Sequence, residues 1–256
     1  MKKIPLDTYR KYEKENPSWK QYLSKAVDEY KFFKTRSQLG RGWDYLVSHP
    51  PIRFASTEKW PWVERIFACN GIIVEDFIQA LKMILNAEDP KVRTLRLIGP
   101  PNTGKSLITQ AIADFFNTCY LSNTGSASEF YFNDAINRSL IVLEEVFIVP
   151  ATVDDFKSVF SGYRLGVNIK QKQTRQILEG VPCIVTGNTG LFGKGFLGGV
   201  DEEALNRRCI TFHLTCPLDL RGVRLTPVDV LSYLTRYPTH CIIDIDEPEE
   251  IEEKEQ

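Results

Sequence analysis

The stretch LRLIGPPNTGKS, residues 95–106, decides the fold of this chain. Its first four residues have the length and character of a short buried strand, and Leu107-Ile108 begin an apolar helix directly after it. Between strand and helix stand Gly99, Pro100, Pro101, Asn102, Thr103, Gly104, Lys105 and Ser106, in the pattern G-x-x-x-x-G-K-S. This spacing between a strand and a helix indicates a phosphate-binding loop.

The residue types of this loop suit a nucleotide with a bound Mg²⁺ ion. Glycines let the backbone curl so that successive N–H groups point at phosphates, and the following helix adds the positive end of its dipole. Lys105 places a cation near the β- and γ-phosphates, and the hydroxyl of Ser106 can ligate Mg²⁺. We therefore expect residues 99–106 to bind a nucleotide.

Polar side chains follow two later apolar runs, at the point where each run ends. Glu144 and Glu145 follow the run SLIVL, and Asn188 follows the run PCIVTG. In an open α/β sheet, ligands bind at the carboxyl ends of the strands, so we expect these side chains beside the loop. One carboxylate can hold Mg²⁺, directly or through water, while the other polarises the attacking water. Asn188 can orient that water or contact the γ-phosphate, although an asparagine also serves an ordinary turn.

The rest of the pattern predicts an α/β fold with a mostly parallel sheet between helices. After residue 90, short apolar runs alternate with helical patterns, which is typical of a parallel sheet covered on both faces. We expect strands near 95–98, 119–121, 140–143, 183–186 and 210–214, and helices near 105–116 and 153–160.

The chain before this core is expected to form a small helical region. Ser18 with Gln21 resembles a capping box, and apolar residues then recur every three or four positions to about Thr35. Prolines predict an irregular segment over 36–62, and a second helix follows Asn70-Gly71. The expected domains are a helical accessory and oligomerisation region at 1–90, the core at 91–243 and an acidic, disordered tail at 244–256.

Composition excludes several classes of protein. The chain has 256 residues, of which 43% are hydrophobic and 25% charged, as in ordinary globular proteins. It has no apolar run of the roughly 18 to 20 residues that a membrane span requires, and its start lacks a signal-peptide pattern. Six scattered cysteines and three isolated histidines predict neither a disulfide framework nor a zinc site. We expect a soluble protein in a reducing compartment, without a membrane partner.

Charge is distributed unevenly along the chain. The net charge is −1, yet residues 244–256 hold eight carboxylates and one lysine, so the rest of the chain is positive. Arg164, Lys170, Lys172 and Arg175 fall within twelve positions that contain no acidic residue. On a strand, Lys170 and Lys172 would share a face, which suits contacts to nucleic-acid phosphates. Solvated chain ends and a protected edge strand would explain the same pattern without a nucleic acid.

Five segments occur in the order typical of one viral enzyme family. They are GPPNTGKS, FYFNDAINRSLIVLEE, GYRLGVNIKQK, IVTGNTG and EALNRRCITFHL. In these segments the chain resembles the superfamily 3 viral helicases, and it is most similar to the parvovirus nonstructural replication initiators of the Rep/NS1 type. The resemblance covers about residues 70–216.

This resemblance implies an AAA+ type P-loop NTPase core that assembles as a ring, expected to be a hexamer. The family hydrolyses ATP with Mg²⁺ and moves along single-stranded DNA with 3′-to-5′ polarity during viral DNA replication, which implies the host nucleus. Residues 99–106 would be Walker A, and Glu144 and Glu145 would be Walker B, with Glu144 and Ser106 holding Mg²⁺. Asn188 would be the sensor, Lys170 and Lys172 would lie on the DNA-gripping pore hairpin, and Arg208, rather than Arg207, would be the arginine finger.

The chain departs from the family pattern in two places. Gly166 and Asn168 stand where parvoviral sequences often carry a basic residue and an aspartate. The His-hydrophobe-His motif of the family's nicking domain does not occur, so no nuclease activity is expected. Two alternatives stay open: an RNA-directed superfamily 3 ATPase, and an assembly module in which the nucleotide stabilises a contact without unwinding.

Overall fold

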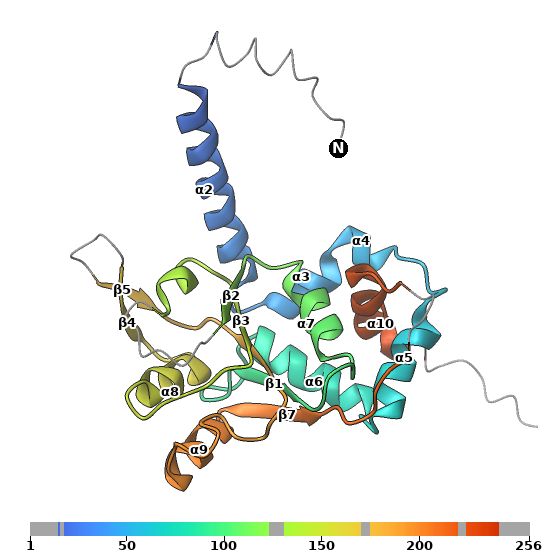
Figure 1. The fold of residues 1–256 in the computed structure, drawn as a ribbon. Coiled ribbons are helices and arrows are strands. Elements are labelled where there is room, and N and C mark those ends of the chain that lie inside the picture. The colour runs from blue at the N-terminus through green and yellow to red at the C-terminus, as the bar shows by residue number, and fades with distance from the viewer. Residues whose placement is uncertain (1–14, 16–17, 123–130, 170–174, 220–223, 241–256) are drawn as a thin grey trace, which may run out of the picture.

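A five-stranded parallel sheet forms the centre of the molecule (Figure 1). The structure, a computed structural model, describes residues 15, 18–122, 131–169, 175–219 and 224–240. The strands are β1 (Thr94–Ile98), β2 (Thr118–Ser122), β3 (Leu140–Glu144), β6 (Cys183–Gly187) and β7 (Cys209–His213), in the spatial order β2-β3-β6-β1-β7. Every neighbouring pair in this sheet is parallel, which confirms the predicted α/β class.

Alternate residues of the strands supply two hydrophobic layers, one on each face of the sheet. In β3, Leu140 and Val142 pack in one layer, while Ile141 and Leu143 pack in the other. The first layer includes residues of α3 (Gly42–Ser48), α4 (Pro50–Arg53), α5 (Trp60–Cys69), α6 (Val74–Leu85), α7 (Lys105–Ala113) and α10 (Pro227–His240). The second includes residues of α8 (Val153–Ser161), α9 (Gly199–Asn206), the 3₁₀ turn Asn133–Ala135 and the antiparallel hairpin β4 (Leu165–Asn168) and β5 (Arg175–Leu178). Because both faces are covered, the strands read as continuous apolar runs in the sequence.

The segment predicted to be irregular, 36–62, is partly helical, so that prediction was wrong. It holds α3, α4 and the start of α5. Pro50 and Pro61 stand in the first turns of α4 and α5, where a helix needs no backbone N–H from them. Helices α3 to α6 pack in one layer with β1, α7 and α10, although the domain boundary near residue 90 stays a prediction.

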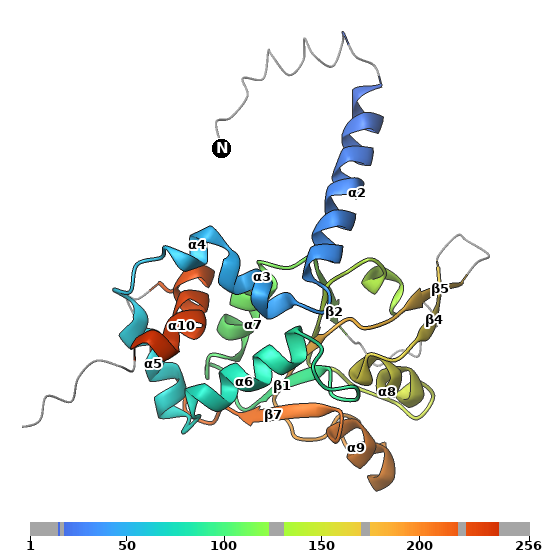
Figure 2. The ribbon, with the colours of Figure 1, turned by 180° about the vertical axis from the view of Figure 1, so that it is seen from behind.

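The helix predicted to begin near Ser18 is present as α2 (Trp19–Gln38), which projects from the body (Figures 1 and 2). The predicted capping box does not form, because Ser18 has a helical backbone and makes no side-chain cap bond. The C-terminal end of α2 is anchored to the body: the Gln38 side chain donates to the carbonyl of Phe115 at 2.8 Å and accepts from the N–H of Asn117 at 3.1 Å. In the described part of the chain, no helix is both long and apolar enough to cross a membrane.

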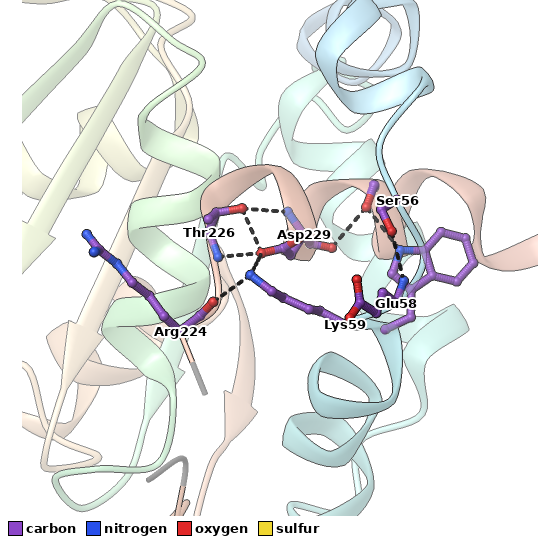
Figure 3. A network of polar contacts seen from close by, with 8 residues as sticks. Ser56, Glu58, Lys59, Arg224, Thr226 and Asp229 are labelled. Carbon is purple, nitrogen blue, oxygen red and sulfur yellow. Dashed lines mark hydrogen bonds and ion pairs between the residues drawn. The ribbon is translucent and has the colours of Figure 1, made fainter. Parts of the chain in front are cut away.

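A network of polar contacts joins the starts of α5 and α10 (Figure 3). The ammonium of Lys59 lies 3.3 Å from the carboxylate of Asp229 and donates to the carbonyl of Arg224 at 2.8 Å. Asp229 accepts from both the N–H and the hydroxyl of Thr226 at 2.7 Å, while its own N–H donates back to that hydroxyl at 3.3 Å. This reciprocal arrangement is a capping box at the start of α10. It fixes α10 against the helices that precede the sheet.

Replacing Asp229 with alanine is expected to lower the free energy of unfolding by about 1–2 kcal/mol, since it removes the cap and the Lys59 contact. Burial alone would raise the pKa of Asp229, but the hydrogen bonds from Thr226 and Lys59 outweigh it and leave the pKa below its ordinary value. The contribution should therefore be present at neutral pH and disappear as the pH falls through that lowered pKa. Urea unfolding of D229A and wild type at several pH values measures both effects.

Asp76→Ala is the matched control for this substitution. Asp76 occupies the same position in the first turn of α6 but is exposed, and α6 has no side-chain cap bond. Its loss removes only a favourable charge near the helix start, which is worth about 0.3–1 kcal/mol. Equal losses in D76A and D229A would contradict the role of the network.

Candidate nucleotide-binding site

The loop between β1 and α7 is held in place by the two strands beside β1. The N–H of Gly99 donates to Gly187 of β6 at 3.0 Å, and the N–H of Leu214, just past β7, donates to Ile98 at 2.7 Å. A Cβ atom at Gly99 would lie 1.7 Å from the carbonyl oxygen of Leu214, so only glycine fits there. Gly104 adopts a φ of 95°, a left-handed conformation that favours glycine. Both glycines of the motif are thus required by the local backbone.

A cavity of about 530 Å³ lies at this carboxyl edge of the sheet. It is lined by Pro101, Asn102, Thr103, Gly104, Lys105, Ser106, Leu107, Glu144, Glu145, Thr186, Asn188 and Leu218. The topology explains the gathering, because β3, β6 and β1 are neighbours and end together: Glu144 pairs with Thr186, and Ile98 with Gly187. The structure therefore brings the predicted loop, the two predicted carboxylates and the predicted asparagine around one space. Gly99 and Pro100, at the start of the loop, are not among the lining residues.

Lys105 is buried and held against its own loop. Its ammonium donates to the carbonyls of Gly99 and Pro100, each at 2.6 Å. Burial lowers the pKa of Lys105, and the nearby charge of Glu145 acts in the opposite direction. The ammonium group of Lys105 is therefore held by the loop at the edge of the cavity. When phosphate oxygens are present, the ammonium can donate to them in place of the two carbonyl oxygens.

Two consecutive carboxylates line the same cavity because the backbone changes direction between them. Successive residues of a strand point to opposite faces, and Glu144 is the last residue of β3. Glu145 adopts a φ of 50°, in the left-handed region, and its N–H donates to the carbonyl of Thr186 at 3.0 Å. This conformation is costly for a residue other than glycine and is typical of functional positions. It places Glu145 beside Glu144 instead of behind the sheet.

The predicted arginine pair lies at the other end of the sheet. Arg207 and Arg208 precede β7, whose first residue pairs with Thr94 at the start of β1, whereas the loop follows the end of β1. Five strand residues span about 16 Å, so Arg208 does not reach the cavity of its own chain.

The two arginines differ in their surroundings. Arg207 forms an exposed ion pair with Glu203. Arg208 donates to the carbonyl of Ala204, and its buried Nε has no hydrogen-bond partner among the described residues. Both arginines line a further cavity of about 300 Å³, together with Lys91, Ser161 and Tyr163. Arg208 therefore keeps donor capacity next to an open space.

A family model described as parvovirus non-structural protein NS1 matches residues 5–231. This chain belongs to the parvovirus NS1 family. The resemblance inferred from the five segments is confirmed, and it extends over the helices that precede the sheet.

Individual relatives support the assignment to the NS1 family. The initiator protein NS1 of murine minute virus (strain MVM prototype) is 35% identical over 127 residues, which are 50% of this chain and 19% of that protein. The initiator protein NS1 of feline panleukopenia virus is 34% identical over 127 residues, 50% of this chain and 32% of the relative. The chain thus spans about a fifth of the length of the first of these relatives.

A solved helicase shares the fold. JCV helicase superposes with a TM-score of 0.60 at 16% identity, and the match covers 84% of this chain and 67% of that chain. Together with the parallel sheet, this shows that the NS1-family chain has the P-loop NTPase fold of that helicase.

The residues around the cavity fit a Mg²⁺ ion. Mg²⁺ prefers oxygen ligands and is commonly held by one or two protein groups together with substrate phosphates. Ser106 and Glu144 offer a hydroxyl and a carboxylate at the cavity. In the described ranges, no group of three or more His, Cys, Asp or Glu residues is arranged to hold a metal. The donor set therefore suits an ion that arrives with a nucleotide.

Sequence reasoning missed the side chain that covers the loop. Leu218, past the end of β7, lines the cavity, and its N–H donates to the carbonyl of Asn102 at 2.7 Å. A Cβ atom at Gly104 would also lie 2.8 Å from its side chain. No sequence motif marks a leucine for this role, since its position depends on how the chain leaves the edge strand.

Lys170 and Lys172, the predicted DNA contacts, lie outside the described residues, between β4 and β5. The strands themselves form the expected hairpin, with Asn168 paired to Arg175 in the register. The Nε of Arg175 donates to the side chain of Asn168 at 2.9 Å. An amide thus serves as the acceptor at one of the two positions where the chain departs from the parvoviral pattern.

Proposed function

We propose that this NS1-family chain is the AAA+ type, ATP-dependent DNA helicase domain of a viral replication initiator. The observation that carries the proposal is the single cavity at which the phosphate loop, Glu144, Glu145 and Asn188 meet. The proposed domain assembles as a hexameric ring, moves 3′ to 5′ along single-stranded DNA and acts in the host nucleus. ATP and Mg²⁺ are its proposed cofactors.

The side chains divide the work of hydrolysis. The backbone N–H groups that follow the two prolines, in residues 102–106, and the ammonium of Lys105 bind the phosphates, while Ser106 and Glu144 hold Mg²⁺, which neutralises phosphate charge when bound. Glu145 polarises the attacking water, and Asn188 orients it or contacts the γ-phosphate. The left-handed backbone of Glu145 supports this division, because it aims the second carboxylate into the cavity.

Self-association would bring an arginine to the nucleotide cavity, which a single chain does not do. Arg208 is too far from the cavity of its own chain, so it can act only on a nucleotide bound by a neighbour. α2 offers a surface for such assembly, since its large apolar side chains are exposed: Tyr22, Leu23, Val27, Tyr30, Phe32 and Phe33. Exposed apolar surface of this kind is typical of interaction sites. This supports the oligomerisation role proposed for residues 1–90.

An unwinding assay on forked DNA, with and without ATP, tests the proposal. We expect strand separation only with ATP, and ATPase stimulated by single-stranded DNA. Stimulation by RNA in place of DNA would favour an RNA-directed ATPase. ATP-dependent assembly without turnover would favour the assembly module and contradict the helicase.

Replacing Glu145 with glutamine is expected to leave ATP binding intact and to slow turnover by about 10²-fold or more, because the amide is nearly isosteric but does not polarise water as a carboxylate does. Equilibrium binding of ATP and single-turnover hydrolysis measure the two effects separately. Glu144→Gln is the comparison. It should instead weaken the binding of Mg²⁺, so that hydrolysis requires a higher Mg²⁺ concentration. If E144Q traps bound ATP while E145Q is mild, the two roles are reversed.

Replacing Lys170 and Lys172 together with alanine is expected to spare basal ATPase and weaken binding of single-stranded DNA. Each lost phosphate contact should reduce the slope of log affinity against log salt by about 0.7 for single strands. Fluorescence anisotropy with labelled oligonucleotides at several salt concentrations measures the slope. An unchanged slope would show that these lysines do not contact phosphates.

A further inference from the structure

Arg96 is a buried arginine in the middle of the central strand β1. Leu95 and Leu97, on either side of it, pack in the layer of α6 and α7, so Arg96 faces the opposite side of the sheet. Its side chain is buried, with only 4% of the residue exposed. A charge in this place costs desolvation energy, and an apolar residue would fill such a site at lower cost. The guanidinium therefore needs a role that an apolar side chain would not perform.

The contacts of Arg96 join two separate segments of the chain. Its Nη1 donates to the side-chain oxygen of Asn206 at 2.7 Å, and its Nη2 donates to the carbonyl of Gly190 at 2.9 Å. The guanidinium also lies over the ring of Phe192, 3.7 Å from its centre. A planar guanidinium fixes the directions of its donors, so the two bonds set the relative position of both segments.

Both segments carry residues of the proposed reaction. Gly190 follows Asn188, which lines the nucleotide cavity, by two positions. Asn206 is the last residue of α9 and stands directly before Arg207 and Arg208. Figure 2 shows α9 at the start of β7, at the end of that strand far from α5 and α10. Arg96 thus lies in the sheet between the strand ends at the nucleotide cavity and the strand ends next to Arg207 and Arg208.

Glu202 makes a second connection between the same segments. This buried carboxylate, on α9, accepts from the N–H of Phe192 at 3.1 Å and from the N–H of Gly193 at 2.7 Å. The loop after β6 is therefore fastened to α9 at one point and, through Arg96, to both β1 and the end of α9.

We propose that Arg96 is a positioning residue that holds the arginine pair in a fixed relation to the loop of Asn188. The proposal rests on the proposed ATPase function. The nucleotide contacts of Asn188 in one subunit then set the position from which Arg208 of that subunit enters the site of its neighbour. Arg96 is not among the residues that line the nucleotide cavity.

The test separates the two bonds of Arg96 by changing Asn206. Asn206→Ala removes the acceptor on α9 and leaves the bond to Gly190, whereas Asn206→Asp keeps an oxygen in place. We expect N206A to lower kcat of the ATPase by about 10- to 100-fold with KM for ATP unchanged, since a misplacement of about 1 Å has that effect. N206D should retain most of the wild-type kcat.

Co-assembly decides whether the loss acts through the arginine pair. Mixing N206A with Lys105→Ala, which lacks a working loop but has an intact Arg96–Asn206 contact, should give several times more activity than the two proteins separately. Arg96→Met removes both bonds and should lose at least as much kcat as N206A, and only part of that loss should return on mixing, because its own Asn188 loop also loses a contact. Arg41→Met replaces an exposed arginine and is the control. Its kcat should equal that of wild type.

Three outcomes would overturn the positioning role. The first is a wild-type kcat in both N206A and R96M. The second is an equal loss of kcat in N206A and N206D. The third is that mixing with K105A restores the ATPase of Arg208→Ala but not that of N206A. An inactive wild type would instead contradict the proposed function itself.

Discussion

Replacing Lys105 with alanine is expected to abolish ATP hydrolysis, a loss of at least about 10³-fold. Among the described residues that line the nucleotide cavity, Lys105 is the only cation. Its ammonium donates to two carbonyls of the loop, each at 2.6 Å, and can donate to the phosphates when it leaves these carbonyls. Charge that develops on the transferring phosphoryl group would have no mobile counter-charge in the variant. The effect should appear mainly in kcat.

Steady-state phosphate release and equilibrium ATP binding measure this effect. Lys82→Ala, on α6 and away from the cavity, is the matched control and should be indistinguishable from wild type. The melting temperature of K105A should stay near that of wild type, because the loop keeps the glycines that its backbone requires. ATPase within a few-fold of wild type would remove the loop from the reaction.

The sequence predicts those parts of the site in which the chemistry is contiguous. The conformation and the chemistry of residues 99–106 can be read from one short segment, since the required glycines, the cation and the hydroxyl lie within eight positions. Glu144 and Asn188 follow apolar runs, and parallel strands bring such ends together whatever lies between them in the chain. The same reasoning gave the sheet, because strands buried on both faces are continuous apolar runs.

Other parts depend on contacts that no local pattern contains. The left-handed backbone of Glu145 accompanies its hydrogen bond to β6, and Leu218 lines the cavity because the chain after β7 is bonded to the loop at Asn102. The apolar stripe of α2 predicts a helix correctly, but periodicity does not tell whether that face packs against the same chain. In the structure Tyr22 and Phe33 are exposed. Arg96 had a signal, a charge inside a buried strand, but its partners lie in distant segments.

Replacing Arg208 with alanine is expected to leave ATP binding nearly unchanged and to slow hydrolysis by about 10³- to 10⁵-fold, the range found for arginine fingers in GTPases. Arg208 stands at the start of β7, the edge strand of the sheet, beside an open cavity of about 300 Å³. A neighbouring subunit that approaches this rim would meet the cavity that both arginines line. The guanidinium would then offset negative charge on the transferring phosphoryl group. Arg207→Ala is the matched control, because Arg207 is held in an exposed ion pair with Glu203 and should be dispensable.

Mixing of two inactive proteins distinguishes action on a neighbour from damage to the chain's own site. Arg208→Ala keeps an intact loop, and Lys105→Ala keeps an intact arginine, so a mixed ring contains interfaces at which both are present. Some activity should therefore return on mixing, and it should reach a maximum at an intermediate ratio of the two proteins. A surface arginine without this role would give R208A full activity alone. Loss of activity in R208A without recovery in mixed rings would show a defect within the subunit, and Arg207 would then be the remaining candidate for the finger.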